Sequence, residues 1–336
     1  MPGAMPEPLP IWFLVLPNTL LLDIAGPAEA FRLANQQRAR RGAPPLFALH
    51  YIGPEAASMS SVGLGLANLE ALPEVLPASS WLFLLGRPGE AGDVVRAAPP
   101  WLAARHWLAR VVAPALTAPT PALRLMTVCS GALLAADAGL VGTRCITTHH
   151  ELLDELRQMA PAAQVVGNRV FVQDGPLFSS AGITAGIDLA LHSIAHIAGE
   201  AMAAAVAQVM VVFQRRAGDA PERSPLLACR SHLHPAVHKV QNAVHADPTR
   251  DWSADALAEV AHVTPRHLGR LFQQHAGLSP RDYVAQVRLA LVDAALASGL
   301  PRGQALAQAG FSSMRAWQRA RATAPGSAQP SQQASG

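Results

Sequence analysis

The chain has 336 residues, of which 50% are hydrophobic and 15% are charged. This balance excludes a disordered protein and allows two domains, each with its own hydrophobic core. No apolar run reaches about 18 residues, so we expect neither a signal or membrane segment nor a membrane partner. The three cysteines, Cys129, Cys145 and Cys229, form no CxxC pair. Their spacing argues against a zinc site or a disulfide framework and favours the reducing cytoplasm. We expect no metal and no cofactor.

Charge is distributed unevenly along the chain. Residues 1–228 carry 15 Arg and Lys against 17 Asp and Glu, a net charge of −2. Residues 229–336 carry 11 against 6, a net charge of +5. Arginine abundance alone is weak evidence, because a single lysine, Lys239, in an alanine-rich chain indicates a GC-rich coding background. The basic excess in the last third is nevertheless typical of a module that binds a polyanion.

Up to about residue 200, short apolar runs alternate with helix-like stretches. The apolar runs predict strands at 11–17, 46–53, 79–86, 122–129 and 169–175. The other stretches predict helices at 26–35, 103–116, 131–139, 150–160 and 185–199. Such alternation is typical of an α/β domain around a mostly parallel sheet. The segment 202–216 fits either a further helix or a last strand.

A break in this pattern, rich in Gly, Pro and charge, predicts an interdomain linker at 215–230. We therefore expect a first domain at 1–214 and an all-helical second domain at 231–322. The low-complexity end of the chain predicts a disordered tail at 323–336.

The second domain contains an internal repeat. Shifted by 49 residues, ALAEVAHVTPRHLGRLF (256–272) aligns with ALAQAGFSSMRAWQRAR (305–321). Each copy has a short apolar helix, a tight turn, a Ser or Thr, and an Arg-bearing helix, which is the layout of a DNA-binding helix-turn-helix. Between the copies, 280–298 predicts an amphipathic helix of roughly 28 Å, which suits two DNA readers about one helical turn apart.

In the first copy, Thr264 is expected to cap the second helix, and Pro265 suits its first position. Leu268, Leu271 and Phe272 form a stripe that faces inward. Arginine binds guanine and glutamine binds adenine through paired hydrogen bonds. The expected DNA-reading side chains on the opposite face are therefore Arg266, His267, Arg270 and Gln274. A helical bundle with solvated arginines is the alternative.

The segment 252–296, with its GLSPxxY turn, resembles the DNA-binding domain of AraC-family transcription regulators. The resemblance covers about 100 residues of the chain. It implies two helix-turn-helix units, promoter DNA and RNA polymerase as partners, and DNA contacts in the second unit at Ser312, Ser313, Arg315 and Arg319. The chain departs from the family where Arg321 replaces the usual Phe and the GxxPxxY close is missing. We therefore expect a thin core in the second unit.

In the first domain, the stretch MTVCSGALLAADAGL (126–140) places Cys129 where a strand turns directly into a helix. The helix dipole is expected to lower the pKa of this thiol. The N–H of Ser130, with one from the Gly86–Arg87 turn, would stabilise an oxyanion. The arrangement predicts a nucleophile elbow, and a small packed cysteine is the alternative.

Residues 20–35, 128–156 and 171–195 resemble the class I glutamine amidotransferase-like superfamily (PfpI type), in the branch fused to AraC-type domains. The resemblance implies a flavodoxin-like sandwich. It places Asp23 at the rim of the site and His149 as the basic partner of Cys129, a set that thiol acyl transfer requires. Alternatively, Asp23 caps a helix and His149 is a surface residue. The implied ligand-binding residues are Asp23, Gly86, Cys129, Ser130, His149, Ser180 and Gly182.

Fusion to DNA-binding units favours sensing over turnover, because an enzyme that consumes its effector erases its own signal. We therefore expect a cytoplasmic, homodimeric transcription regulator that is not an enzyme and that keeps Asp23, Cys129 and His149 as a vestigial or ligand pocket. The resemblance implies an amino acid or quaternary amine as the small-molecule effector. The alternatives are an amidase or hydratase that uses Cys129, a redox sensor through Cys129, and a domain that only dimerises.

Overall fold

The computed structural model describes most of the chain, at residues 7–77, 79–88, 98–118, 123–223, 227, 229–230, 232–297 and 299–323. The chain forms two compact units, Met1–Glu222 and Arg223–Gly336. Their boundary falls inside the predicted linker. Of the predicted tail, 324–336 lies outside the described residues, whereas Thr323 ends a helix.

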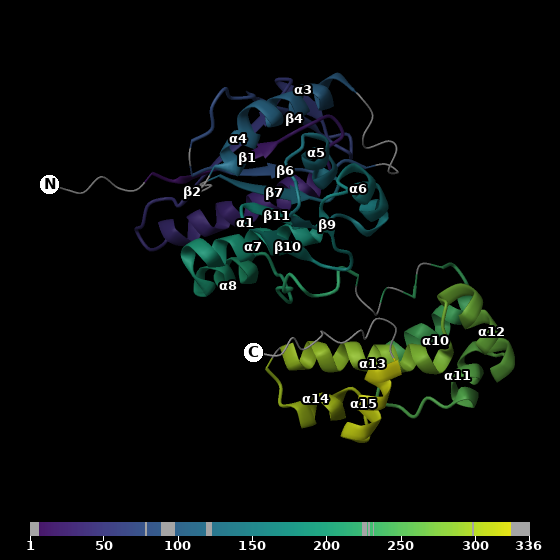
Figure 1. The fold of residues 1–336 in the computed structure, drawn as a ribbon. Helices are drawn as coiled ribbons and strands as arrows, with labels where there is room; N and C mark the ends of the chain where they lie inside the picture. The colour runs from purple at the N-terminus through teal and green to yellow at the C-terminus, as the bar shows by residue number, and fades with distance from the viewer. Residues whose placement is uncertain are drawn as a thin grey trace, which may run out of the picture. The chain divides into compact units, whose positions relative to one another are not determined.

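The first unit is built around a seven-stranded sheet with the order β10-β11-β7-β6-β1-β2-β5 (Figure 1). All neighbouring strands are parallel except β10 and β11, which confirms the predicted α/β domain. The strands are β1 (Leu9–Leu14), β2 (Phe47–Gly53), β5 (Glu70–Ala71), β6 (Trp81–Leu84), β7 (Arg124–Val128), β10 (Phe171–Asp174) and β11 (Leu177–Ser180).

Two small pairs of strands lie outside this sheet. Strands β3 (Ala57–Met59) and β4 (Gly65–Ala67) are antiparallel, whereas β8 (Cys145–Ile146) and β9 (Gln164–Val165) are parallel. All five predicted strands of the central sheet are present, but β5 and β11 are additional to the prediction.

Helices cover both faces of the sheet, and the alternation of strand side chains explains why (Figure 1). Phe13 of β1 enters one core and the next residue, Leu14, enters the other. The first core lies under α1 (Leu21–Ala39), α7 (Thr184–Ala198) and α8 (Glu200–Val209). The ambiguous segment 202–216 is therefore helical up to Val209.

The second core lies against helices that follow strands β6 and β7 in the chain. They are α3 (Pro99–Trp107), a π-helical turn (Leu108–Val112), α4 (Ala113–Thr117), α5 (Gly131–Asp137), a 3-10 turn (His150–Leu152) and α6 (Leu153–Met159). Among the described helices of the whole chain, none is both long and apolar enough to cross a bilayer.

The regular secondary structure in the described part of the second unit consists of helices only. Its helices are α10 (Pro235–Ala246), α11 (Ala254–Ala261), α12 (Pro265–Ala276), α13 (Pro280–Ala297), α14 (Arg302–Gln308) and α15 (Met314–Thr323). The predicted connecting helix is α13, and it joins two separate cores. Tyr283, Val284 and Val287 belong to the first core, and Leu289 and Val292 belong to the second.

The first part of the predicted linker packs on the first unit. The Asp188 carboxylate of α7 accepts hydrogen bonds from the backbone N–H of Arg216 at 2.9 Å and from its Nε at 2.8 Å. Six residues later, Glu222 bonds to His150. The chain is therefore held on the first unit as far as Glu222, later than the sequence pattern predicts.

Candidate functional site

The candidate site of the first unit lies where β6, β7 and β11 end. The register pairs Leu84 with Thr127 and Val128 with Ser180, so these parallel strands end at the same edge of the sheet. In open α/β sheets, ligands bind at this carboxyl edge. Backbone contacts bring together the turns that carry the predicted residues Asp23, Gly86, Cys129, Ser130, His149, Ser180 and Gly182.

The backbone at Cys129 has the strain expected of a nucleophile elbow. Its φ of 53° lies in the left-handed region, which a non-glycine residue enters only when its surroundings hold it there. The N–H donates to the Ser180 carbonyl at 3.1 Å, and the carbonyl accepts from Thr148 Oγ1 at 2.8 Å. A Cβ at Gly182 would lie 2.9 Å from the Cys129 sulfur, so this position requires glycine.

The thiol itself is not activated. Cys129 is only 6% exposed, and burial together with the Asp23 carboxylate raises its pKa to about 12. The hydrogen bond with the Ser130 backbone lowers this pKa but is outweighed. The expected lowering by the helix dipole is therefore wrong, because desolvation of the thiolate exceeds the effect of a seven-residue helix. Cys129 is a neutral thiol at neutral pH.

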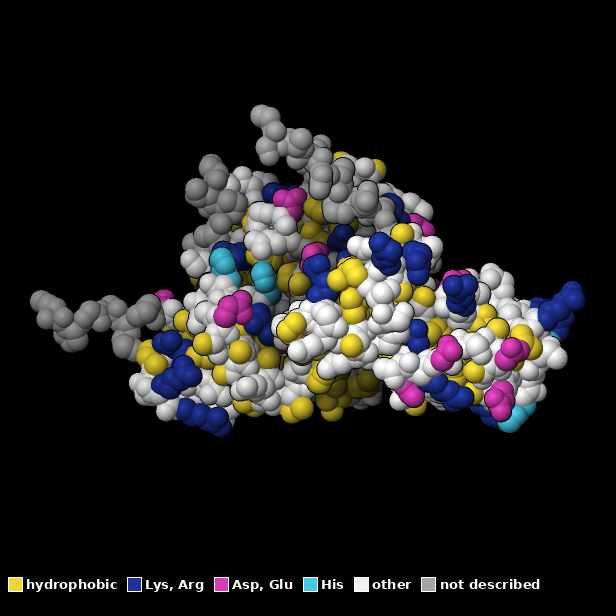
Figure 2. Space-filling view, turned by 90° about the horizontal axis from the view of Figure 1, so that it is seen from below, with side chains coloured by type: hydrophobic (Ala, Val, Ile, Leu, Met, Phe, Trp, Pro, Cys, Tyr) yellow, Lys and Arg dark blue, Asp and Glu magenta, His cyan; other side chains and the backbone are white. Residues whose placement is uncertain are grey.

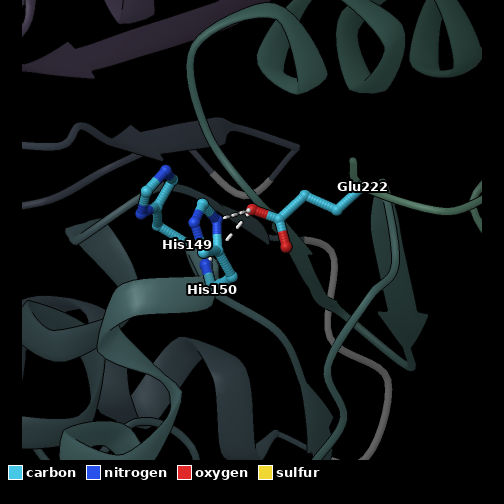
Figure 3. A group of neighbouring side chains, drawn as sticks. All are labelled: His149, His150 and Glu222. Carbon is cyan, nitrogen blue, oxygen red and sulfur yellow. Dashed lines mark hydrogen bonds and ion pairs between the residues drawn. The ribbon is translucent and has the colours of Figure 1, made fainter. Parts of the chain in front are cut away.

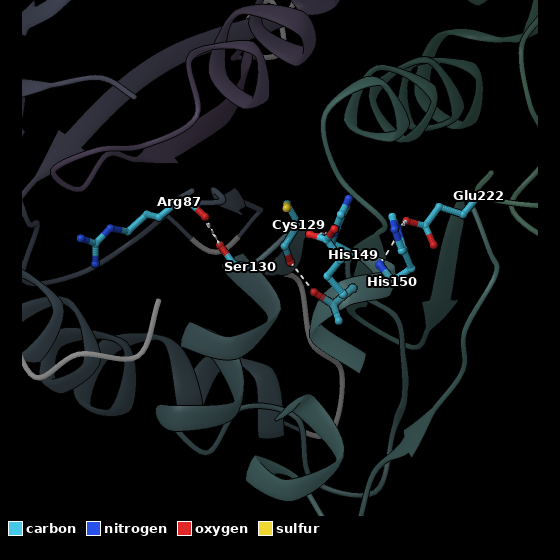
Figure 4. A network of polar contacts seen from close by, with 8 residues as sticks. Arg87, Cys129, Ser130, His149, His150 and Glu222 are labelled. Carbon is cyan, nitrogen blue, oxygen red and sulfur yellow. Dashed lines mark hydrogen bonds and ion pairs between the residues drawn. The ribbon is translucent and has the colours of Figure 1, made fainter. Parts of the chain in front are cut away.

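The N–H groups of the Gly86–Arg87 turn, which are expected from the sequence to bind an oxyanion, are occupied by other groups of the protein, and Figure 4 shows the contact between Arg87 and Ser130. The Gly86 N–H donates to Asp23 Oδ2 at 3.0 Å, and the Arg87 N–H donates to Ser130 Oγ at 2.7 Å. Ser130 Oγ in turn donates to the Arg87 carbonyl at 3.1 Å. The prediction that this turn offers an N–H to an oxyanion is wrong for the conformation observed here.

Asp23 is fully buried rather than at the rim of the site, which corrects the prediction. Its two oxygens accept hydrogen bonds from the N–H groups of Gly86 and Ile183, each at 3.0 Å. Burial raises the pKa of Asp23 to about 6, and the two hydrogen bonds oppose that rise. The carboxylate joins α1 to the turns after β6 and before α7, so it does not cap its own helix.

His149 and His150 lie at the surface beside this buried cluster. Their rings are 4.2 Å apart between centroids, and His149 Nδ1 is 3.5 Å from the Glu151 carboxylate. His150 donates its backbone N–H to Glu222 Oε1 at 3.1 Å, and its Nδ1 lies 2.9 Å from the same oxygen (Figure 3). Glu222 is not among the residues predicted from the sequence, because it lies 72 residues after His150, in the predicted linker.

The first helix-turn-helix has the predicted construction. Thr264 Oγ1 accepts from the His267 N–H at 3.3 Å, and Pro265 begins α12, which confirms the predicted cap. Leu268, Leu271 and Phe272 are buried in the core of the unit, also as predicted. The tight turn between α11 and α12 places His262 in the left-handed region.

The predicted DNA-reading face of α12 is open to solvent. Arg266, Arg270 and Gln274 are exposed, and His267 is partly buried. Arg270 Nη2 lies 3.1 Å from His267 Nδ1, so the two side chains form one polar group. Figure 2 shows basic, acidic and hydrophobic side chains interspersed on the face that it displays, without a continuous basic patch there.

The second helix-turn-helix is formed by α14 and α15. Ser313 Oγ accepts from the Ala316 N–H at 3.2 Å and thus takes the place of Thr264. The predicted contact residues Ser312, Ser313, Arg315 and Arg319 are all exposed. Trp317 is the large buried side chain of this pair of helices.

Comparison with known proteins matches both units. A family model described as a helix-turn-helix domain matches residues 257–325. The HTH-type transcriptional regulator GbdR of Pseudomonas aeruginosa is 28% identical over 86% of this chain and 74% of its own length. The HTH-type transcriptional regulator GlxA of Rhizobium meliloti is 28% identical over 83% of this chain and 81% of its own length.

Solved structures resemble the chain over a smaller part. An AraC family transcriptional regulator from Pseudomonas putida covers 60% of the chain at 18% identity, with a TM-score of 0.48 and all of its own length matched. A THiJ/PfpI family protein from Pseudomonas syringae covers 64% at 22% identity, with a TM-score of 0.46 and 84% of its own length matched.

The named regulators match this chain through both of its units, and the second unit has the capped helices and exposed arginines of a DNA reader. The chain is therefore a helix-turn-helix transcriptional regulator that is similar along both units to these HTH-type regulators, and its second unit is a DNA-binding domain with two helix-turn-helix pairs of helices.

Proposed function

We propose that this regulator reads promoter bases with α12, the recognition helix of its first helix-turn-helix. Arg266, His267, Arg270 and Gln274 supply the base contacts, because arginine and glutamine offer paired donors and acceptors to guanine and adenine. Ser312, Ser313, Arg315 and Arg319 of α15 contact the same DNA. The chain acts in the cytoplasm as a homodimer whose two-fold symmetry pairs half-sites, and RNA polymerase is its protein partner.

The observation that carries this proposal is the exposure of two arginines on a capped, well-packed recognition helix. Arg266 and Arg270 project from α12, whose other face is fixed by Leu268 and Phe272. A rigid helix holds these guanidinium groups in a defined geometry toward a base edge.

The experiment is fluorescence anisotropy of the full chain on DNA from upstream of its own coding region, at two salt concentrations. We expect salt-sensitive binding that exceeds binding to scrambled DNA. Lack of any preference for the upstream DNA would contradict the proposal.

We infer that the first unit binds a small nitrogen-containing metabolite, an amino acid or quaternary amine, at the carboxyl edge of the sheet. Of the seven predicted residues, His149 and Gly182 reach the surface, and the other five are buried beneath them. Asp23, Gly86, Cys129, Ser130 and Ser180 therefore shape the floor of the site, whereas His149 contacts the effector. A thermal-shift screen of amines and amino acids tests this. Stabilisation that persists in His149→Ala would contradict the assigned contact.

An enzyme is the second candidate, favoured by the left-handed backbone at Cys129. We propose that the chain has no turnover, because its thiol is neutral and the N–H groups of the adjacent turn are occupied. Incubation with amide and isonitrile substrates tests this proposal, and turnover that disappears in Cys129→Ala would overturn it.

A further inference from the structure

A group of three metal-binding side chains lies beside the candidate site. His149, His150 and Glu222 each offer a ligand atom, and these atoms all lie within 4.8 Å of one another (Figure 3). The two histidines precede α6, whereas Glu222 is the last residue of the first unit. The group therefore joins the body of the sensing domain to the point where the chain leaves it.

The ligand types select a class of ion. Two imidazoles and one carboxylate suit zinc and the neighbouring divalent transition metals, and the same set leaves a fourth position open. Nitrogen and oxygen ligands lie about 2.0–2.2 Å from zinc. In a tetrahedral site this places them about 3.4 Å apart, so no pair of ligand atoms, now within 4.8 Å, has to approach by more than about 1.4 Å. In the sequence, the spacing of the cysteines argues against a zinc site. None of the three cysteines belongs to this group, so that argument does not apply to it.

The burial of these three side chains and the contacts that they already make favour ion binding over a solvent-exposed His–Glu pair. The Glu222 side chain is only 9% exposed, and His149 and His150 are 25% and 33% exposed. Both hydrogen bonds that described residues make to the Glu222 carboxylate fall on Oε1. The backbone bond from His150 fixes this carboxylate next to the imidazoles, so the ligands are partly preorganised before an ion arrives.

We propose that His149, His150 and Glu222 form a site for a divalent transition-metal ion, with zinc as the first choice. The bound ion replaces the contacts between His149 and Glu151 and between His150 and Glu222. It fixes residue 222, where the first unit ends, and thereby changes DNA binding by the second unit. This regulatory consequence rests on the proposed function, whereas metal binding itself does not.

The test is calorimetric titration of zinc into the full chain, without an affinity tag and after removal of metal with a chelator. We expect binding by the native chain that weakens at least about tenfold in Glu222→Gln and in His150→Ala. Glu222→Gln keeps an acceptor for the His150 N–H, and its melting temperature without zinc checks the fold. Unchanged binding in both variants, or no binding by the native chain, overturns the site.

The chain offers two matched controls. His50 Nδ1 lies 3.1 Å from Glu70 Oε1, which is a His–Glu pair without a second imidazole, so His50→Ala should leave the affinity unchanged. A cluster of imidazoles in the second unit, at His232, His234, His238 and His275, is a competing site for zinc among the described residues. Loss of binding in His234→Ala but not in Glu222→Gln would overturn the assignment.

A second measurement separates the site from its consequence. We expect zinc to change the affinity of the native chain for its upstream DNA and to leave that of Glu222→Gln unchanged. Equal zinc effects on both proteins overturn the regulatory part. If neither protein prefers the upstream DNA, with or without zinc, the proposed function fails, and the titration still decides the metal site.

Discussion

The two helix-turn-helix units have one layout but different cores. The first is held by thirteen buried hydrophobic side chains and the second by six, counted over the described residues. The difference is clearest at the repeat position where Phe272 of α12 aligns with Arg321 of α15. Phe272 is fully buried, whereas Arg321 is exposed, with its guanidinium 5.2 Å from the centre of the Trp317 ring.

The same helix-turn-helix arrangement is thus stabilised by a larger hydrophobic core in the first copy than in the second. Helix α13 contributes side chains to both cores. The second helix-turn-helix therefore packs on a helix that the core of the first helix-turn-helix also holds in place. We therefore expect the first helix-turn-helix, formed by α11 and α12, to provide most of the stability of the DNA-binding domain and most of its base discrimination.

The largest expected effect comes from Phe272→Ala. Truncating a fully buried Phe removes its burial and leaves a cavity, which typically costs about 3–5 kcal/mol. We expect this loss in the free energy of unfolding, measured with denaturant and followed by the helical circular dichroism signal. The aligned change Arg321→Ala is the control, and it should cost less than about 1 kcal/mol, because it removes an exposed cation–π contact and a solvent-screened attraction to Asp293. Equal losses would refute the asymmetry.

A smaller effect is expected on DNA recognition. Arg266→Ala should weaken binding to the preferred promoter sequence by roughly 1–3 kcal/mol and relax the choice of one base. The aligned Arg315→Ala should cost less, because α15 is held by the smaller core. Anisotropy titrations on the preferred DNA and on single-base variants measure both. Arg281→Ala, at an exposed position of α13, controls for the loss of one positive charge.

The caps of the two recognition helices should be nearly equivalent. Thr264 and Ser313 accept backbone N–H bonds of 3.3 and 3.2 Å. Thr264→Ala and Ser313→Ala should each cost about 1 kcal/mol of helix stability, and Thr264→Ser should cost much less, since it keeps the oxygen. Amide hydrogen exchange in the first turns of α12 and α15 measures this. A much larger effect in one helix would show that the caps share in the asymmetry.

Features with a local cause could be predicted from the sequence. Continuous apolar runs indicate the parallel strands, and the Thr264–Pro265 pair indicates the start of α12. Strand β11 escaped prediction, because it has four residues and ends in two serines that are buried only in the folded sheet.

The electrostatics of the first unit depend on contacts between distant residues. Asp23 meets Gly86 and Ile183 across 63 and 160 residues of sequence. These contacts bury the carboxylate and bring it close enough to raise the pKa of Cys129. A helix N-terminus beside a cysteine is visible in the sequence, but the desolvation that outweighs the dipole is not. The pairing of Glu222 with His150 is hidden for the same reason.

The smallest expected effect concerns the centre of the second core. Trp317 is buried, and its indole Nε1 has no hydrogen-bond partner among the described residues. An unpaired buried donor costs about 1–3 kcal/mol, which offsets much of what the larger ring gains over a phenyl ring. Trp317→Phe should therefore change the free energy of unfolding by less than about 1 kcal/mol, whereas Trp317→Ala should cost more than Trp317→Phe, because it leaves a cavity, but less than Phe272→Ala, because the cavity lies in the smaller core. Denaturant unfolding of both variants decides the matter. A large loss in Trp317→Phe would mean that the whole indole ring holds this core together.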